Sequence, residues 1–409
     1  MAHQRITIPE LLAPAGNLEK LRFALLYGAD AVYLGGSAFS LRSRAGNFSL
    51  EEMAEGTAFA RHLGKKVYLA LNIFPHDNDL KDLEAFLPQV AELAMDGVIV
   101  ADLGTFAMVQ EKLPGTPIHV STQANILNVR TAQFWEKLGA RRLVLARELT
   151  SAEIEGIGKA TAAEIEVFVH GAMCMAYSGR CLMSTFMTGR DANLGDCAQP
   201  CRWAYGLTEQ TRRGQIFPVV EESKGTFIMN SKDLNLVRHL PALIGAGVTS
   251  LKIEGRMKSL YYVAAVTRIY RQALDRVAKE GKDYQFDETW WDELKRVSHR
   301  DYTTGFFLGR NDMEMQEQKS GGYIQSDVFL GIVREVADDG HVIVEARNKI
   351  VPGDRVEWIG PGMTTFHGSI GQIRNLEGAL LSSSKPQQSV RLFVDHPVAV
   401  NFLLRKKVP

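Results

Sequence analysis

A repeated helix-then-strand pattern is the feature that most limits how this chain can fold. From Glu10 to about Gly171, amphipathic stretches end at a glycine, and each is followed by a short run rich in Val, Ile and Leu. Glycine often ends a helix because it adopts the left-handed conformation at little steric cost. Runs of aliphatic residues are typical of strands buried on both faces. The glycines in question are Gly28, Gly64, Gly97 and Gly139.

The repeat predicts an α/β fold in which eight parallel strands close into a TIM-like (β/α) barrel. Strand and helix patterns alternate from residue 10 to about residue 280, which fits a barrel of ordinary size. An open doubly wound sheet is the alternative, but no G-x-G-x-x-G motif follows the first run and no P-loop is present. A ninth run, TFIMN at 226–230, is expected to be accessory. The eight predicted strands are ELLAPAG at 10–16, AVYLGG at 31–36, KVYLALN at 66–72, VIVAD at 98–102, PIHVSTQ at 117–123, RLVLARE at 142–148, EIEVFVHG at 164–171 and SLKIEG at 250–255.

Residues that favour helix N-termini stand where the predicted helices begin. Asn17 is a candidate N-cap for the first helix. Ser49 with Glu52, and Thr150 with Glu153, have the spacing of a capping box. These positions support the same alternation of helices and strands.

Periodicity divides the chain into a barrel domain at 1–280, a connector at 281–325 and a small β domain at 326–409. A strongly amphipathic helix at 259–280 ends the first domain. The connector is polar and aromatic, and we expect helix and loop there. After it, apolar and polar residues alternate between DDG, VPGD and PG turns, which indicates a small all-β, barrel-like domain.

All four cysteines lie in one loop, residues 171–205, inserted after the seventh predicted strand. Their spacing is C-x6-C-x15-C-x3-C, and they are Cys174, Cys181, Cys197 and Cys201. Four thiols are the ligand set of a tetrahedral zinc site or an iron–sulfur cluster. Two disulfides are a further alternative, although disulfides are typical of small secreted domains. The loop therefore predicts a four-cysteine metal site.

The spacing and the neighbouring residues favour iron–sulfur over zinc. Structural zinc sites usually contain close pairs such as C-x2-C, whereas six residues separate the first pair here. Apolar residues of the loop would form a sheath that shields a cluster, unless they are ordinary core residues. They are Met173, Met175, Tyr177, Met183, Phe186 and Met187.

Polar residues follow several predicted strands, at the end where barrel enzymes carry their chemistry. They are Asn72, Asp102, Gln123, Arg147, Glu148, His170, Glu254 and Arg256. As a set they indicate a site for a small polar molecule, although single members could instead form salt bridges that close the barrel. Because Cys174 follows His170 by four residues, the cysteine loop leaves from the same rim.

The overall composition excludes few classes of protein or partner. The chain has 47 Lys and Arg against 47 Asp and Glu, so the net charge argues neither for nor against nucleic acid as a partner. No signal peptide is visible at the start, and no window approaches the ~18 apolar residues of a membrane span. We expect a cytoplasmic protein that does not bind membranes.

Long motifs resemble those of the collagenase-like peptidases, family thirty-two of the peptidases of unassigned type. The signature is EVFVHGAMC at 166–174 followed by CLMS at 181–184. Further matching motifs are PELLAPAGNLEKL, YGADAVYLGG, LNIFPH, STQAN, FWEKLG, LARE, FIMNSKDL and LKIEGRMKSLYYV. Within the family, the chain is similar to bacterial proteins that hydroxylate the wobble uridine of tRNA to 5-hydroxyuridine using prephenate.

The resemblance implies a barrel domain, a C-terminal β domain and a [4Fe–4S] cluster held by the four cysteines, with zinc as the alternative. It implies tRNA and prephenate as partners, with a paralogous subunit as a possible further partner. Relatives act on a ribosomal cytidine or a ubiquinone precursor, so another RNA or ring substrate is an alternative. A collagenase-like peptidase is a third, but the sequence has no H-E-x-x-H or G-x-S-x-G motif, and Ser184 has no evident base. A non-catalytic, zinc-containing RNA-binding factor is the fourth.

Prephenate carries two carboxylates, for which guanidinium groups are suitable partners. Our candidates are Arg147, Arg256 and Arg42, with Gln123 and Asn72 as further substrate-binding residues.

Other residues are assigned catalytic or RNA-binding roles. Lys252 is expected to point from the other face of its strand. His170, Tyr177 and Glu254 are the catalytic candidates, for proton or radical transfer. Candidate RNA contacts are Lys258, Arg202, Trp203, Tyr205, Arg212, Arg213, Arg405, Lys406 and Lys407.

Overall fold

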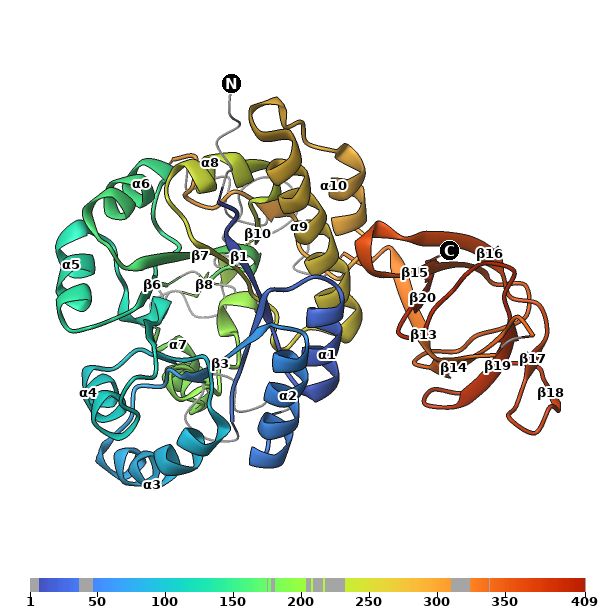
Figure 1. The fold of residues 1–409 in the computed structure, drawn as a ribbon, viewed down its shortest axis with the longest axis horizontal. Helices are drawn as coiled ribbons and strands as arrows, with labels where there is room; N and C mark the ends of the chain where they lie inside the picture. The colour runs from blue at the N-terminus through green and yellow to red at the C-terminus, as the bar shows by residue number, and fades with distance from the viewer. Residues whose placement is uncertain are drawn as a thin grey trace.

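The computed structural model describes residues 7–36, 47–174, 176–177, 181–203, 207–208, 216–217, 232–309, 324–337 and 339–408. Arg42, Met175, Tyr205, the Arg212–Arg213 pair and the run at 226–230 lie outside the described residues. Figure 1 shows two domains side by side, a barrel with its surrounding helices and a smaller body of strands. No helix in the described part of the chain is long and apolar enough to cross a membrane.

Eight parallel strands form a closed barrel, as predicted. Strand β11 pairs with β1 on one side and with β7 on the other, and this double pairing closes the ring. All eight predicted runs form strands in the predicted order. The strands are β1 (Glu10–Pro14), β2 (Ala31–Leu34), β3 (Lys66–Leu71), β4 (Gly97–Val100), β5 (Ile118–Val120), β6 (Arg142–Val144), β7 (Glu164–Ala172) and β11 (Ser250–Ile253).

Helices connect the strands and cover the outside of the barrel (Figure 1). The predicted N-cap at Asn17 and both capping boxes are confirmed. Helix α9 coincides with the amphipathic helix predicted at 259–280, and most of it is buried. The helices of the barrel domain are α1 (Leu18–Leu26), α2 (Leu50–His62), α3 (Asp77–Leu93), α4 (Leu103–Lys112), α5 (Val129–Lys137), α6 (Ser151–Ala160), α8 (Leu240–Gly245) and α9 (Leu260–Glu280).

One predicted helix end is wrong. Helix α3 is ended by Ala94, which has the left-handed conformation with φ of 48°, whereas Gly97 is the first residue of β4. Gly97 is small for a packing reason, because a Cβ there would lie 3.0 Å from the carbonyl oxygen of Pro117 and 3.3 Å from Nε2 of His119.

Two short strands extend the barrel sheet beside β7. Strand β10 (Asp233–Asn235) pairs antiparallel with β7, and β12 (Tyr302–Thr303) pairs parallel with β10. A separate two-stranded pair, β8 (Leu207–Thr208) and β9 (Ile216–Phe217), follows the cysteine loop. The added strands place residues of the connector next to the end of β7.

The C-terminal domain is an antiparallel sheet with its own hydrophobic core. Its strand order is β16-β15-β20-β13-β14-β19-β17-β18, and the sheet curls into a rounded body in Figure 1. The strands are β13 (Asp327–Val336), β14 (His341–Ala346), β15 (Arg355–Ile359), β16 (Thr365–Ser369), β17 (Ile373–Arg374), β18 (Leu380–Leu381), β19 (Ser389–Phe393) and β20 (Leu403–Lys407).

Buried arginines join the two domains. Arg405 of β20 is fully buried and donates to Glu357 at 2.7 Å and to Glu293 at 2.7 Å. Glu293 lies on helix α10 (Glu288–Leu294) of the connector and also accepts from the buried Arg268 of α9 at 2.7 Å. The prediction that Arg405 contacts RNA is therefore wrong, because its guanidinium is committed to this interface.

Candidate functional site

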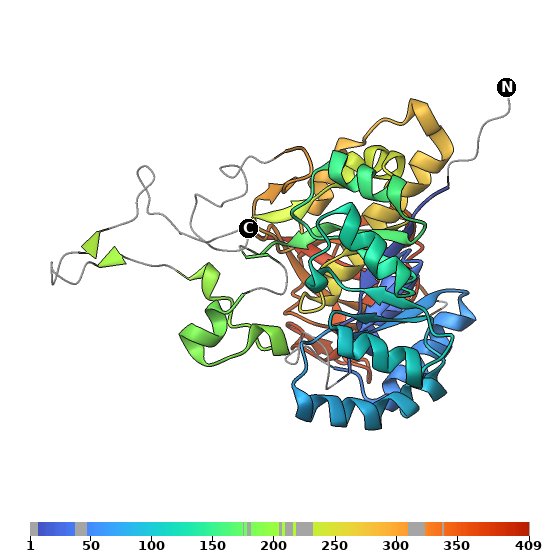
Figure 2. The ribbon, with the colours of Figure 1, turned by 90° about the vertical axis from the view of Figure 1, so that its left-hand side faces the viewer.

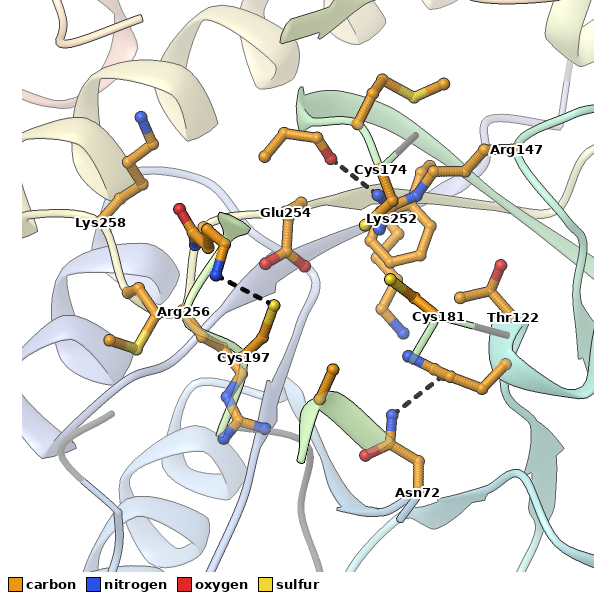
Figure 3. A pocket seen from close by; sticks show the side chains of 18 of the residues that line it. Asn72, Thr122, Arg147, Cys174, Cys181, Cys197, Lys252, Glu254, Arg256 and Lys258 are labelled. Carbon is orange, nitrogen blue, oxygen red and sulfur yellow. Dashed lines mark hydrogen bonds between the residues drawn. The ribbon is translucent and has the colours of Figure 1, made fainter. Parts of the chain in front are cut away.

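A cavity of about 940 Å³ opens at the C-terminal ends of the barrel strands. Its walls come from the barrel, the cysteine loop and the C-terminal domain, which contributes Phe329 and Asn348. Figure 3 shows side chains of these walls converging on one space. The structure thus has a cavity at the rim that the sequence predicted, and the C-terminal domain forms part of the cavity wall.

All four cysteines line this cavity. Cys174 is exposed, the other three are half-buried, and all four are thiols rather than disulfides. The donor set matches a four-thiolate metal site in kind and number. Among the described residues, however, no three His, Cys, Asp or Glu side chains are gathered closely enough to form a metal cage. The four thiols thus line one cavity but are not gathered into a cage in this structure.

Local hydrogen bonds order the two halves of the cysteine loop around helix α7 (Met183–Thr188). The buried Ser184 Oγ accepts from the amide of Ala198 at 2.8 Å, which joins α7 to the second pair of cysteines. The Gln199 amide donates to Sγ of Cys197 at 3.3 Å. The Ser184 hydroxyl is thus a structural group, and it is not among the cavity-lining residues.

The predicted apolar sheath around the cysteines is only partly present. Met173 is buried and lines the cavity. Met183 and Tyr177 line the cavity as well. In contrast, Phe186 of α7 is 89% exposed, so it shields nothing in this structure. In Figure 2, α7 stands outside the ring of barrel helices, which explains this exposure.

The structure brings together most of the strand-end residues that were predicted to bind substrate. Asn72, Gln123, Arg147 and Arg256 all line the cavity. The Asn72 amide donates to Oε1 of Gln123 at 3.2 Å, so the two amides form one polar wall. Asp102 serves a different purpose, because its carboxylate caps helix α4 by accepting from the Thr105 amide.

Two of the three catalytic candidates reach the cavity. Glu254 lines it and accepts from the Tyr33 hydroxyl at 3.3 Å, and Tyr177 lines it with 52% of its surface exposed. His170 is not a lining residue. Its ring is buried against three tyrosines, and burial, aided by the charge of His299, lowers the pKa of His170 to about 3.

The expectation for Lys252 is wrong. Residues two apart in a strand share a face, and Lys252 lines the cavity on the same face as Glu254. Its ammonium lies 2.8 Å from Oε1 of Glu166, which is fully buried. The lysine therefore reaches the cavity floor from inside the barrel.

Sequence reasoning missed the charged interior of the barrel beneath this floor. Arg142 bonds Glu10 at 2.7 Å and Glu166 at 3.0 Å. Burial raises the pKa of the Glu166 carboxyl, but Lys252 and Arg142 outweigh this effect and lower that pKa to about 2. The signal in the sequence was a charged residue at an inward position of three strands, at Glu10, Arg142 and Glu166.

The cavity is electropositive. Among its described lining residues, the cationic side chains are Arg147, Lys252, Arg256 and Lys258, and the one carboxylate is Glu254. Such a surface favours anionic ligands.

Comparisons with known proteins agree with this architecture. Residues 16–317 match Peptidase family U32, and residues 325–405 match the Peptidase family U32 C-terminal domain. The chain is 40% identical to tRNA hydroxylation protein P1 of Bacillus subtilis (strain 168) over 97% of this chain and 94% of that protein. It is 39% identical to tRNA hydroxylation protein P of Escherichia coli (strain K12) over 86% of each chain.

Among solved structures, the U32 peptidase Mk0906 is similar at 15% identity, with a TM-score of 0.41, over 62% of this chain and 96% of that one. The sequence matches cover both domains, including the cysteine loop and every barrel strand that lines the cavity. The chain belongs to peptidase family U32.

Proposed function

We propose that this protein is a cytoplasmic tRNA hydroxylase that forms 5-hydroxyuridine at the wobble position in a prephenate-dependent reaction. The observation that carries the proposal is the convergence of four cysteines and four cations on one cavity. The similarity to two tRNA hydroxylation proteins over nearly the whole chain supports tRNA as the substrate.

The four cysteines would hold a [4Fe–4S] cluster in this proposal. Such a cluster, when bound, supplies single-electron transfer beside the substrate. The chain's own part is to present the four thiols at the cavity. Ser184 and the Gln199 amide order the half of the loop that contains Cys197.

Prephenate would bind inside the cavity through its two carboxylates. Arg147 is the leading partner, because its guanidinium stacks over the Phe168 ring at 3.9 Å and is thereby fixed in direction. Arg256, also a lining residue, is the second. The paired amides of Asn72 and Gln123 would bind the hydroxyl group of the same molecule.

An unstacked uridine would enter from the open side of the cavity. Tyr177 and Trp203 are 52% and 41% exposed on the cysteine loop, and exposed aromatic rings stack on RNA bases. Lys258 also lines the cavity and would contact a phosphate. Glu254 lies between the cations and is placed to accept a proton from the base or from prephenate (Figure 3).

The site does not favour a peptidase. A serine peptidase needs a hydroxyl activated by a base, whereas the Ser184 hydroxyl is buried and accepts from a backbone amide.

Nucleoside mass spectrometry of tRNA from a deletion strain tests the proposal. We expect the strain to lack 5-hydroxyuridine and its derivatives, or to retain only what a paralogue makes. Wild-type protein should restore them, and Cys174→Ala should not. Unchanged modification after deletion of this gene and of any paralogue would contradict tRNA hydroxylation, and loss of a ribosomal RNA hydroxylation instead would reassign the substrate.

The metal is tested separately by analysis of the anaerobically purified protein. Iron and sulfide at about four per chain, with visible absorption, are expected for a [4Fe–4S] cluster. Colourless protein with stoichiometric zinc would contradict the cluster.

A further inference from the structure

Two cations of the cavity, Lys252 and Arg147, approach one aromatic ring. Nζ of Lys252 lies 5.4 Å from the ring centroid of Phe168 and 4.4 Å from that of Tyr33. Cζ of Arg147 lies 3.9 Å from the same Phe168 centroid. Because both cations also line the same cavity, a single small molecule in it can contact both of them.

Lys252 is held in place from below. Its ammonium has three donors, and Glu166 accepts one of them at 2.8 Å. Glu166 also accepts from Arg142 at 3.0 Å and from the Ser250 hydroxyl at 3.1 Å. Because Glu166 takes one of the three donors and does not line the cavity, the ammonium of Lys252 has further N–H groups to offer a ligand above it.

Arg147 carries a donor that awaits an acceptor. Its Nη1 donates to the carbonyl of Ala172 at 2.7 Å. Its Nε is buried and has no hydrogen-bond partner among the described residues. A buried donor without an acceptor is unfavourable, so an anionic oxygen that reaches this nitrogen would satisfy it.

We propose that Lys252 and Arg147 form an inner subsite that binds a carboxylate of the small-molecule cosubstrate. This inference rests on the proposed function, in which that cosubstrate is prephenate. Lys252 is almost fully buried in the barrel interior, so a ligand that reaches it must be small. A carboxylate is the group that takes hydrogen bonds from an ammonium and a guanidinium at once. Glu166 is the positioning residue, because it acts through Lys252.

The two other cations of the cavity come from a different segment. Arg256 and Lys258 lie on the segment that follows β11, near Phe329 and Asn348 of the C-terminal domain. In Figure 3 they lie on one side of Glu254, and Arg147 and Lys252 lie on the other. Arg256 is as buried as Lys252 and stays available to the second carboxylate of the small molecule, which leaves Lys258 for the RNA.

Calorimetric titration of the full-length protein with prephenate, without tRNA, tests this assignment. Lys252→Met should weaken prephenate binding about 10- to 100-fold, the loss expected for a charge-assisted hydrogen bond. Because Lys252→Met leaves Glu166 with one cation fewer, the double variant Lys252→Met/Glu166→Gln restores the charge balance and should show the same loss. Both variants should bind tRNA like the wild type.

The matched control is Lys66→Met, which removes a lysine paired with Glu10 at the opposite end of the barrel. It should bind prephenate like the wild type. A folded double variant with wild-type affinity for prephenate would overturn the inner subsite, even if the protein hydroxylates tRNA. A wild-type protein that binds phenylpyruvate through Lys252 but does not bind prephenate would uphold the carboxylate subsite and contradict the proposed cosubstrate.

Discussion

At the scale of single residues, the cavity depends on side chains that never touch a ligand. Ser184 joins α7 to the turn that contains Cys197, and Glu166 holds the ammonium group of Lys252 in position. Neither role could be predicted from the sequence. A serine beside cysteines suggests a nucleophile, and only the fold brings the amide of Ala198 to its hydroxyl.

Ser184→Ala is predicted to weaken metal retention without abolishing the fold. The substitution leaves a half-buried amide without its acceptor, at a cost of about 1–3 kcal/mol that falls on the cysteine loop. The rate of iron loss to a chelator should rise. Ser49→Ala is the control, because it removes a helix cap worth about 1 kcal/mol far from the loop. Equal iron loss from both variants would show that Ser184 has no local role.

The buried histidines make the fold sensitive to acid. Burial lowers the pKa of both His119 and His170 to about 3, with smaller contributions from neighbouring cations. A histidine in the unfolded chain has its ordinary pKa of about 6.5, so the unfolded state binds more protons between about pH 3 and pH 6.5. Stability present at neutral pH is therefore lost as pH falls below about 6.5, by about 1.4 kcal/mol per pH unit for each histidine.

His170→Phe tests this pH dependence, since it keeps an aromatic ring among the tyrosines. The free energy of unfolding should be measured with urea between about pH 6.5 and about pH 4. Its slope against pH should be lower in the variant than in the wild type, by the equivalent of about one bound proton. An unchanged slope would mean that His170 does not remain neutral in the folded protein.

At the scale of elements, the sequence predicts the barrel well because its signals are local. Runs of aliphatic residues, N-caps such as Asn17 and capping boxes each act within a few residues. Two features depend instead on how strands meet across the barrel. They are the face that each side chain takes at the end of β11 and the ion pairs around Arg142 in the barrel interior. Such contacts join residues far apart in the chain, which is why Lys252 was placed on the wrong face.

Gly171 lies near the end of strand β7, just before the cysteines, and Gly171→Ala is predicted to distort the junction between the strand and the cysteine loop. Gly171 has φ of +103°, and a Cβ would lie 2.5 Å from the carbonyl oxygen of Glu254. Gly247→Ala is the matched control, since Gly247 has φ of +81° but no atom within 4 Å of the added Cβ. Each variant should lose about 1 kcal/mol or more from backbone strain. Only Gly171→Ala should also weaken prephenate binding. Equal prephenate binding by the two variants would contradict the close packing of Gly171 against Glu254.

At the scale of the whole molecule, the second domain completes the cavity. Phe329 and Asn348 line it, and their position depends on the buried ion pairs of Arg405 and Arg268 with Glu293. The sequence predicted two domains and a connector, but it did not indicate that the connector helix carries the carboxylate that joins them.

Arg405→Met is predicted to loosen the domain interface. It leaves Glu357 and Glu293 with fewer cationic partners in a buried place, and breaking such a pair costs about 3–5 kcal/mol. Limited proteolysis should cut the variant between the domains faster than the wild type. Lys407→Met, at an exposed end of the same strand, should be cut at the wild-type rate. Equal rates for both variants would show that the ion pairs do not hold the domains together.

The central claim is that the cysteine loop and the cationic cavity form one site. The most direct measurement is the electron paramagnetic resonance spectrum of the reduced, anaerobically purified protein with and without prephenate. We predict an iron–sulfur signal that changes when prephenate saturates the wild-type protein and does not change in Lys252→Met at the same concentration. A signal that saturating prephenate leaves unchanged, or no iron–sulfur signal at all, would contradict the account.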